Sequence, residues 1–104
     1  MQRGEVWWGN ITSPIGKRPV VLLTRDKAYN VRTSVTIAPI TRTERGILTE
    51  VPLDETDGMQ TKCVVNLDDI MTIPTTALID KITTLSPEKM QAVKRAIIFA
   101  LDLK

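Results

Sequence analysis

The 104 residues, 42% hydrophobic and 25% charged with a net charge of +2, suit one folded domain around a single modest core. No apolar run approaches the roughly 18 residues of a membrane-spanning helix, the N-terminus lacks the apolar stretch of a signal peptide, and the single cysteine, Cys63, cannot form a disulfide within the chain, so we expect a cytoplasmic protein with no membrane partner. The absence of histidine excludes Ser-His-Asp and Cys-His triads and imidazole zinc sites, and the single cysteine excludes all-thiolate metal sites.

Short β-rich runs bounded by turn residues dominate the sequence up to residue 85. They predict strands at Glu5–Trp8, Pro19–Thr24, Ser34–Ile40, Thr49–Leu53, Thr61–Asn66 and Asp69–Ile73, with a turn-rich loop at Asn10–Lys17. Pro52 places the fourth strand at a sheet edge or a strand end. The sixth continues the fifth after a bend at Leu67-Asp68. The segment Ala77–Thr83 is a last strand or a short helix, and its threonines favour a strand.

The final segment carries the signals of an amphipathic helix. Ser86 is a helix N-cap, and Pro87 suits the first helical position. Apolar residues then recur at spacings of three and four, at Met90, Val93, Ile97, Ala100 and Leu101. We therefore predict a mainly β (α+β) fold, a small partly closed barrel with a C-terminal amphipathic helix packed on it.

Basic residues are concentrated in the first part of the chain. Residues 1–45 hold eight basic and three acidic side chains, whereas residues 46–104 hold six basic and nine acidic ones. This asymmetry indicates one face for a polyanion, unless the two halves interleave in space and give an evenly charged surface.

Two basic segments flank predicted strands. Lys17 and Arg18 stand directly before the second strand, and Thr41, Arg42 and Thr43 follow the third. An arginine at a strand end is held by the sheet and is well positioned to bind a phosphate. If the two strands are neighbours, Arg18 and Thr41 project from the same rim. A solvated rim charge and a turn-capping hydroxyl are the alternatives.

A polar segment, Asn66-Leu67-Asp68-Asp69, follows the fifth strand. Paired carboxylates can perform acid–base chemistry or bind a hard cation. Neighbouring side chains in a strand point to opposite faces, so Asp68 and Asp69 are not expected to share a ligand. We expect turn residues or acceptors for base edges here, and no metal or other cofactor.

Trp7 and Trp8 are also expected to face opposite ways, because they are neighbours in the first strand. One ring then enters the core and the other reaches the surface. A surface tryptophan can stack on a nucleobase or fill a subunit interface.

Five segments in register resemble the MazF/PemK/Kid toxins, and the resemblance extends from Arg3 to the final helix. They are Arg3-Gly4-Glu5-Val6-Trp7-Trp8, Lys17-Arg18-Pro19-Val20-Val21, Ala38-Pro39-Ile40-Thr41, Val64-Val65-Asn66-Leu67-Asp68-Asp69-Ile70 and Leu85-Ser86-Pro87-Glu88-Lys89-Met90. The resemblance implies one toxin domain over residues 1–104 with an SH3-like barrel, and a homodimer. It also implies a metal-independent endoribonuclease that cuts single-stranded RNA at short sequences and so stops translation. Messenger RNA is the first substrate expected, with ribosomal and transfer RNA left open. A cognate MazE-like antitoxin would cover the RNA groove with an extended acidic tail.

The resemblance assigns the family's catalytic arginine to Arg18 and its catalytic threonine or serine to Thr41. Scission would proceed by attack of a ribose 2′-oxygen on phosphorus, leaving a 2′,3′-cyclic phosphate and a 5′-hydroxyl. Some relatives use a histidine in the first loop and an arginine before the later aspartate; this chain has no histidine, and Asn66 stands in the arginine's place. Candidate RNA-binding residues are Lys17, Asn30, Arg42, Thr43, Asn66, Asp68 and Asp69.

A second class of function is a non-catalytic poison of DNA gyrase, as in the CcdB toxins, which share this barrel. Those toxins act through the end of the terminal helix. The present chain ends Phe99-Ala100-Leu101-Asp102-Leu103-Lys104, without the tryptophan expected there. A third possibility is a barrel module that binds RNA or peptide without cutting it. The ribonuclease is the leading hypothesis.

Overall fold

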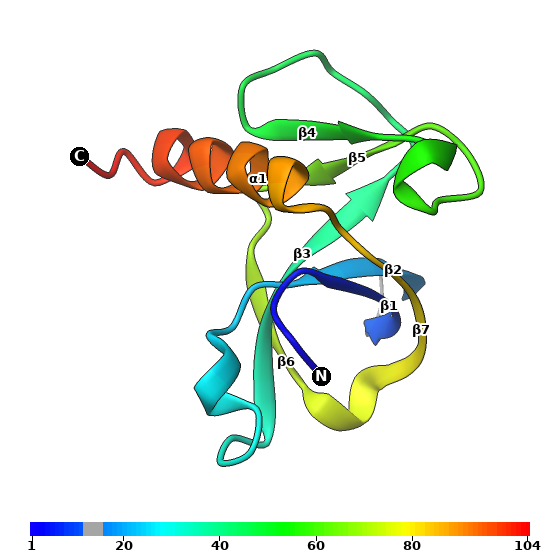
Figure 1. Ribbon diagram of the computed structural model, residues 1–104, viewed down its shortest axis with the longest axis vertical. Coiled ribbons are helices and arrows are strands. Elements are labelled where there is room, and N and C mark those ends of the chain that lie inside the picture. Colours follow the sequence, from blue (N-terminus) through cyan, green and yellow to red (C-terminus); the bar gives the residue numbers. More distant parts are fainter. Residues whose placement is uncertain (12–15) are drawn as a thin grey trace.

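The computed structural model describes residues 1–11 and 16–104. Within them the chain forms seven strands, three short 3-10 turns and one α-helix (Figure 1). In chain order these elements are β1 (Glu5–Ile11), β2 (Gly16–Leu22), η1 (Asp26–Ala28), β3 (Ser34–Thr41), β4 (Glu50–Leu53), η2 (Glu55–Asp57), β5 (Cys63–Asn66), β6 (Met71–Pro74), η3 (Thr75–Ala77), β7 (Leu78–Thr84) and α1 (Pro87–Ala100). The predicted mainly β (α+β) fold with a C-terminal helix is confirmed. None of its described helices is long and apolar enough to cross a membrane.

The strands form one strongly curved antiparallel sheet in the order β4-β5-β3-β2-β1-β7, and β6 pairs with β3 beside this path. The two ends of the path, β4 and β7, do not pair with each other among the described residues. The barrel is therefore open, as the prediction of partial closure requires. Pro52 lies in the edge strand β4, where its missing N–H removes no bond from the centre of the sheet.

β3 is the central strand and pairs with three others. Its middle faces β2, with Val20 opposite Pro39. Its first half pairs with β6, and its last residues, Ile40 and Thr41, pair with β5. β5 and β6 thus follow each other along β3, which confirms the predicted bend between them.

Several predicted boundaries differ from those in the structure. β1 and β2 stay paired as far as Ile11 opposite Gly16, so both strands run into the segment Asn10–Lys17 that was predicted as a loop. The remainder of that segment, residues 12–15, lies outside the described residues. The segment Ala77–Thr83 corresponds to β7, so the strand interpretation was correct, and the turn η3 precedes it.

Two clusters of buried apolar side chains pack on the two sides of the sheet. The first fills the concave side of the sheet and includes Val93 and Ala96 of α1, which covers β4 and β5 in Figure 1. The Ser86 hydroxyl oxygen accepts the Lys89 N–H at 3.1 Å, so the predicted N-cap is confirmed. Leu101 follows the last helical residue and is exposed, because the chain leaves the apolar stripe where the helix ends.

The second cluster lies on the other side of the sheet, on β1, β2, β3 and β6. It includes the fully buried Val20 and Ile37. Side chains alternate between the two sides of a strand, so Arg18 and Val20 share this outer side, whereas Pro19 and Val21 face the concave one. The outer side of β2 and β3 therefore carries both an apolar cluster and, at its end, an arginine.

Candidate functional site

A pocket of about 240 Å³ opens where β3 ends beside the first half of β2. Five of the residues predicted for the site line it together with three that were not predicted. The lining residues are Arg18, Pro39, Thr41, Thr43, Arg45, Glu50, Asn66 and Asp69.

The pairing of β2 with β3 brings Arg18 and Thr41 together. Val20 lies opposite Pro39, and each of the two predicted catalytic residues is two positions further toward the same end of the sheet. Two positions along a strand keep a side chain on the same face, so both project on the outer side. Thr41 is held on its other edge by Val64 of β5. The predicted common rim is therefore present.

The two arginines of the pocket form no ion pair with an acidic residue in the described part of the chain. Among residues 1–11 and 16–104 the ion pairs are Lys81 with Glu5 at 3.5 Å and Lys89 with Asp57 at 3.7 Å, and neither involves Arg18 or Arg45. Arg18 is half-buried and Arg45 is exposed, and the planar donors of a guanidinium match a phosphate. The pocket, which also holds the carboxylates of Glu50 and Asp69, thus offers two guanidinium groups to a ligand.

The Thr41 hydroxyl keeps a proton to donate. Its Oγ1 accepts the Thr43 N–H at 3.3 Å, which is the turn-capping bond expected of a threonine at this place. A hydroxyl can accept and donate at the same time. The capping bond therefore orients Oγ1 without using its hydrogen, and the hydroxyl can still donate to an oxygen of a bound phosphate.

The bend between β5 and β6 forms one wall of the pocket. Asn66 Nδ2 donates to Asp69 Oδ2 at 2.8 Å, and Asn66 Oδ1 accepts the Asp68 N–H at 2.9 Å. Asp68 turns away from the pocket, and its Oδ2 accepts the Thr49 hydroxyl at 2.7 Å. The two aspartates thus face different partners, and the structure brings Asn66 and Asp69, but not Asp68, to the pocket.

Lys17 and Arg42 lie next to a second, smaller pocket. Lys17 is exposed, with its Nζ 5.3 Å from the ring centre of Trp8. Trp8 and Arg42 line a hollow of about 140 Å³ that also reaches Thr41 and Cys63. Burial, and less strongly Asp57, raises the pKa of the Cys63 thiol despite the nearby Arg42, so the thiol stays protonated at neutral pH.

Trp7 and Trp8 face opposite ways, as the strand pattern predicts. Trp7 packs against the second apolar cluster, and its Nε1 donates to Glu5 Oε1 at 2.9 Å. Trp8 lines the smaller pocket. Both rings are half-buried, so neither is a core residue in the full sense.

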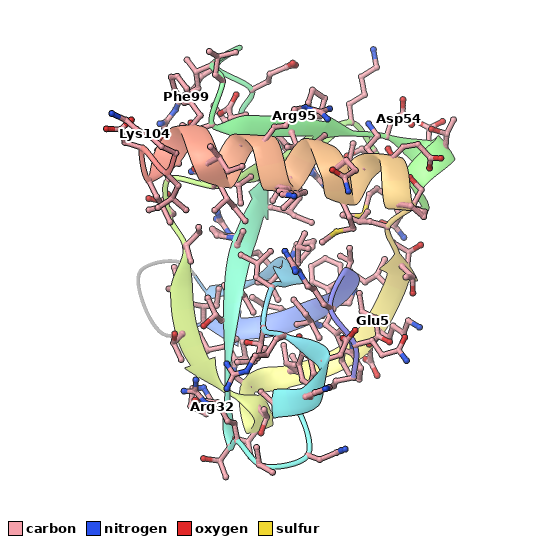
Figure 2. All side chains as sticks on the ribbon, turned by 60° about the vertical axis from the view of Figure 1, so that its left-hand side comes forward. Glu5, Arg32, Asp54, Arg95, Phe99 and Lys104 are labelled. Atoms are coloured by element: carbon pink, nitrogen blue, oxygen red, sulfur yellow. The ribbon has the colours of Figure 1, made fainter. Side chains whose placement is uncertain are left out.

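Asn30 is not brought to the pocket. It lies in the turn before β3, at the opposite end of that strand from Thr41. Arg32, two residues further on, marks this end of the molecule in Figure 2, far from helix α1. A strand of eight residues spans roughly 25 Å, which separates Asn30 from the other candidates.

Sequence reasoning missed three lining residues, Pro39, Arg45 and Glu50. Arg45 belongs to the basic segment that already holds Arg42, so its charge was visible in the sequence. Glu50 gave no such signal, because its position depends on the pairing of β4 with β5, where it lies opposite Asn66. No three Cys, Asp or Glu side chains in the described parts of the chain gather closely enough to hold a metal ion.

The chain is thus a small β protein, an open antiparallel barrel with a pocket at its rim that presents two arginines, two hydroxyls and an amide. The family described as PemK-like, MazF-like toxin of type II toxin-antitoxin system matches residues 2–101, and the chain belongs to this family. Both the fold and the predicted resemblance are thereby confirmed.

Relatives and solved structures agree with this assignment. Endoribonuclease MazF3 of Mycobacterium tuberculosis is 43% identical over 86 residues, which cover 83% of this chain and 84% of that protein. The structure of the Mycobacterium tuberculosis toxin MazF-mt6 has 37% identity and a TM-score of 0.89, and the match covers 96% of this chain and 98% of that one. An endoribonuclease in complex with its cognate antitoxin from a mycobacterial species has 25% identity and a TM-score of 0.89, covering 100% and 97% of the two chains.

Proposed function

We propose that the protein cleaves single-stranded RNA at the Arg18–Thr41 pocket, by attack of a ribose 2′-oxygen on the adjacent phosphorus. At the coarser level, the chain is an endoribonuclease toxin of a type II toxin-antitoxin system, as its family membership and the endoribonuclease relatives indicate. The observation that carries the finer proposal is the convergence of an unpaired arginine and a proton-donating threonine in one pocket.

Arg18 would stabilise the negative charge that develops on the phosphate, and Thr41 would orient the phosphate through its hydroxyl. The phosphorane formed by 2′-oxygen attack is more negative than the starting phosphodiester, so a fixed guanidinium stabilises the transition state more than the ground state. Arginine keeps its proton up to a pH of about 12, so Arg18 would serve as an electrostatic group and a proton donor, not as a base. The 2′-hydroxyl gives its proton to solvent water as its oxygen bonds to phosphorus, and the 5′-oxygen takes up a proton as its bond to phosphorus breaks. The products are therefore a 2′,3′-cyclic phosphate and a 5′-hydroxyl.

The remaining pocket residues would bind the RNA strand around the scissile phosphate. Thr43, Asn66 and Asp69 lie within reach of such a strand, and Lys17 and Arg42 would extend the basic surface toward Trp8. An antitoxin with an extended acidic tail would compete for the same basic surface, since its carboxylates match the two unpaired arginines. We propose that the toxin acts in the cytoplasm as a homodimer and stops translation by cutting messenger RNA.

The test is cleavage of a long RNA in EDTA by wild-type protein and by the Arg18→Ala and Thr41→Ala variants. Wild type is expected to give discrete cuts whose new 5′ ends accept label from a polynucleotide kinase without prior phosphatase treatment. Removing a preorganised donor to the transition state costs about two to three decades in rate, so both variants should be slower by that factor.

Arg25→Ala is the matched control, because Arg25 is an exposed arginine just after β2, at the end away from Arg18. It should cleave like wild type. Intact RNA at wild-type protein concentrations that bind it would contradict the proposal and make a gyrase supercoiling assay the next experiment.

A further inference from the structure

Glu50 is a carboxylate inside the pocket that the chemistry of Arg18 and Thr41 does not use. It is the first residue of β4, is half-buried, and lines the pocket together with Arg45. Its Oε1 accepts the N–H of Arg45 at 2.9 Å and the N–H of Gly46 at 3.1 Å. Hydrogen bonds to a carboxylate are about twice as strong as neutral ones, so this oxygen ties two consecutive residues firmly to β4.

The segment between β3 and β4 has few other contacts that would hold its backbone in place. Residues 42–48 are exposed and form no helix or strand. Exposed segments with few buried contacts open at low free energy. Besides the two bonds to Glu50, the segment is closed by the Glu50 N–H donating to the Ile47 carbonyl at 3.1 Å. Gly46 adopts φ +70°, a left-handed turn that glycine permits, and so directs the chain back toward β4.

The segment 42–48, which Glu50 binds, contributes two residues to the pocket. Thr43 and Arg45 both line the pocket, and they come from this segment and from no regular element. The Glu50 carboxylate binds the backbone of Arg45, so it fixes the point from which the guanidinium extends. Fixing a binding group before the ligand arrives lowers the entropy lost on binding.

We propose that Glu50 is a positioning residue for RNA: its carboxylate holds the Arg45–Gly46 backbone and thereby keeps Arg45 and Thr43 at the pocket. This inference rests on the proposed ribonuclease function. Glu50 acts through Arg45, whose backbone N–H its Oε1 accepts, and under this proposal it has no part in removing the proton of the 2′-hydroxyl. Its action therefore concerns binding of the RNA and not the rate of the bond-breaking step.

Steady-state cleavage of a short RNA by the full-length protein separates these roles. Glu50→Ala removes both acceptor bonds and should raise KM about tenfold with kcat changed less than about threefold. Glu50→Gln keeps an amide oxygen that can accept the same two N–H groups, so its KM should stay within about threefold of wild type. Glu44→Ala, an exposed acidic residue of the same segment, is the matched control and should behave as wild type.

A double-mutant cycle tests whether the effect passes through Arg45. Arg45→Ala should raise KM, and Glu50→Ala introduced into Arg45→Ala should add little, because a residue that acts through another has no further effect once that one is gone. Amide hydrogen exchange of Arg45 and Gly46 should be faster in Glu50→Ala and unchanged in Glu50→Gln. A purely structural role of Glu50 would lower the urea midpoint without this selective change.

Two outcomes overturn the inference. One is a Glu50→Ala variant with the KM and amide exchange of Glu44→Ala. The other is a Glu50→Gln variant that binds normally but loses kcat, which would make Glu50 a base. If the wild type fails to cut RNA, the proposed function fails separately. The inference is then still decided by amide exchange and by binding of a 2′-deoxy oligonucleotide, which needs no cleavage.

Discussion

Arg18 and Arg45 remain available to a ligand because the acidic residues around them are occupied by neutral donors. Asp68 accepts a threonine hydroxyl, Asp69 accepts an asparagine amide, and Glu50 accepts two backbone amides. Each carboxylate is satisfied without a cation. The pocket holds as many carboxylates as arginines, Glu50 and Asp69 against Arg18 and Arg45. At the scale of single residues, the two guanidinium groups are therefore available through the choice of hydrogen-bond partners and not through an excess of positive charge.

Glu5 provides a test of electrostatics away from the pocket. Burial alone would raise the pKa of this carboxyl, but the Trp7 indole, the Gln2 backbone and Lys81 together hold it below its ordinary value of 4.5. The unfolded chain then takes up the proton first, so the contribution of Glu5 to stability is present above pH 4.5 and is lost as the pH falls through the lower folded value.

We expect Glu5→Gln to be less stable than wild type at neutral pH, with a difference that shrinks on acidification. Urea midpoints measured at about pH 7, 5 and 3 check this. Glu44→Gln, at an exposed site, should keep the wild-type pH dependence. A Glu5→Gln variant whose difference from wild type is constant over this range would contradict the assignment.

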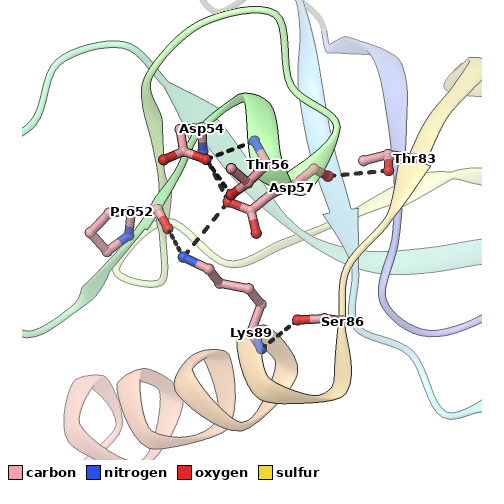
Figure 3. Close-up of polar contacts among 7 residues, drawn as sticks. All are labelled: Pro52, Asp54, Thr56, Asp57, Thr83, Ser86 and Lys89. Carbon is pink, nitrogen blue, oxygen red and sulfur yellow. Dashed lines mark hydrogen bonds and ion pairs between the residues drawn. The ribbon is translucent and has the colours of Figure 1, made fainter.

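At the scale of elements, a network of polar contacts joins η2 to the start of α1 (Figure 3). Asp54 and Asp57 cap η2 reciprocally, and Lys89 of α1 reaches Asp57 at 3.7 Å and the Pro52 carbonyl at 2.7 Å. The Thr83 hydroxyl donates to the Asp57 carbonyl at 3.2 Å. Strands β4 and β7, which do not pair with each other in the described ranges, are thus linked through η2.

The contact between η2 and Thr83 of β7 requires a glycine at position 58. We expect replacement of Gly58 to disrupt this contact. At Gly58, φ is +93°, and an added Cβ would lie 2.4 Å from Thr83 Oγ1 and 2.8 Å from Thr83 Cβ. Gly58→Ala should therefore combine backbone strain with a clash and destabilise the protein by about 3 kcal/mol. Urea unfolding measures the change.

Gly46→Ala is the matched control, because Gly46 also has a positive φ, +70°, but no atom lies within 4 Å of an added Cβ. Strain alone should destabilise this variant by about 1 kcal/mol. Equal losses in the two variants would show that the contact with Thr83 does not matter.

Local signals predicted the elements well, and long-range pairing accounts for what they did not show. The helix cap at Ser86 and the bend after Asn66 depend on hydrogen bonds between residues that are close in the sequence. Asp68 and Asp69 face different partners as predicted, but they lie in the turn between β5 and β6 and not in a strand, so strand alternation is not the cause. Which of the two faces the pocket depends on Thr49 in a distant segment. Glu50 was missed for the same reason, because only the register of β4 against β5 places it near Asn66.

At the scale of the molecule, the arginines of the pocket should make nucleic-acid binding strongly dependent on salt. Each phosphate contact to single-stranded nucleic acid contributes about −0.7 to the slope of log K against log salt concentration. Arg18→Ala and Arg45→Ala should each make the slope shallower by about this amount. Binding of a fluorescent 2′-deoxy oligonucleotide at several salt concentrations gives the slopes.

Arg95 provides the control for this measurement. It is exposed on α1 and is not among the residues that line the Arg18–Thr41 pocket, although it lines another hollow between β4 and α1. Arg95→Ala should leave the slope unchanged. A flat salt dependence of the wild type would argue against phosphate contacts altogether.

The position of β3 also determines the order in which the molecule comes apart. A strand with neighbours on both edges can detach only after those neighbours have left, whereas β4 and β7 can fray singly. Thr41 ends β3, so its hydroxyl is attached to the part of the sheet that opens last. A toxin molecule that has lost its helix or β7 by partial unfolding would then keep Arg18 and Thr41 on adjoining strands. Fraying of β4 would release Glu50 and weaken RNA binding first, and loss of the bond-breaking step by heat or urea would follow the collapse of β3.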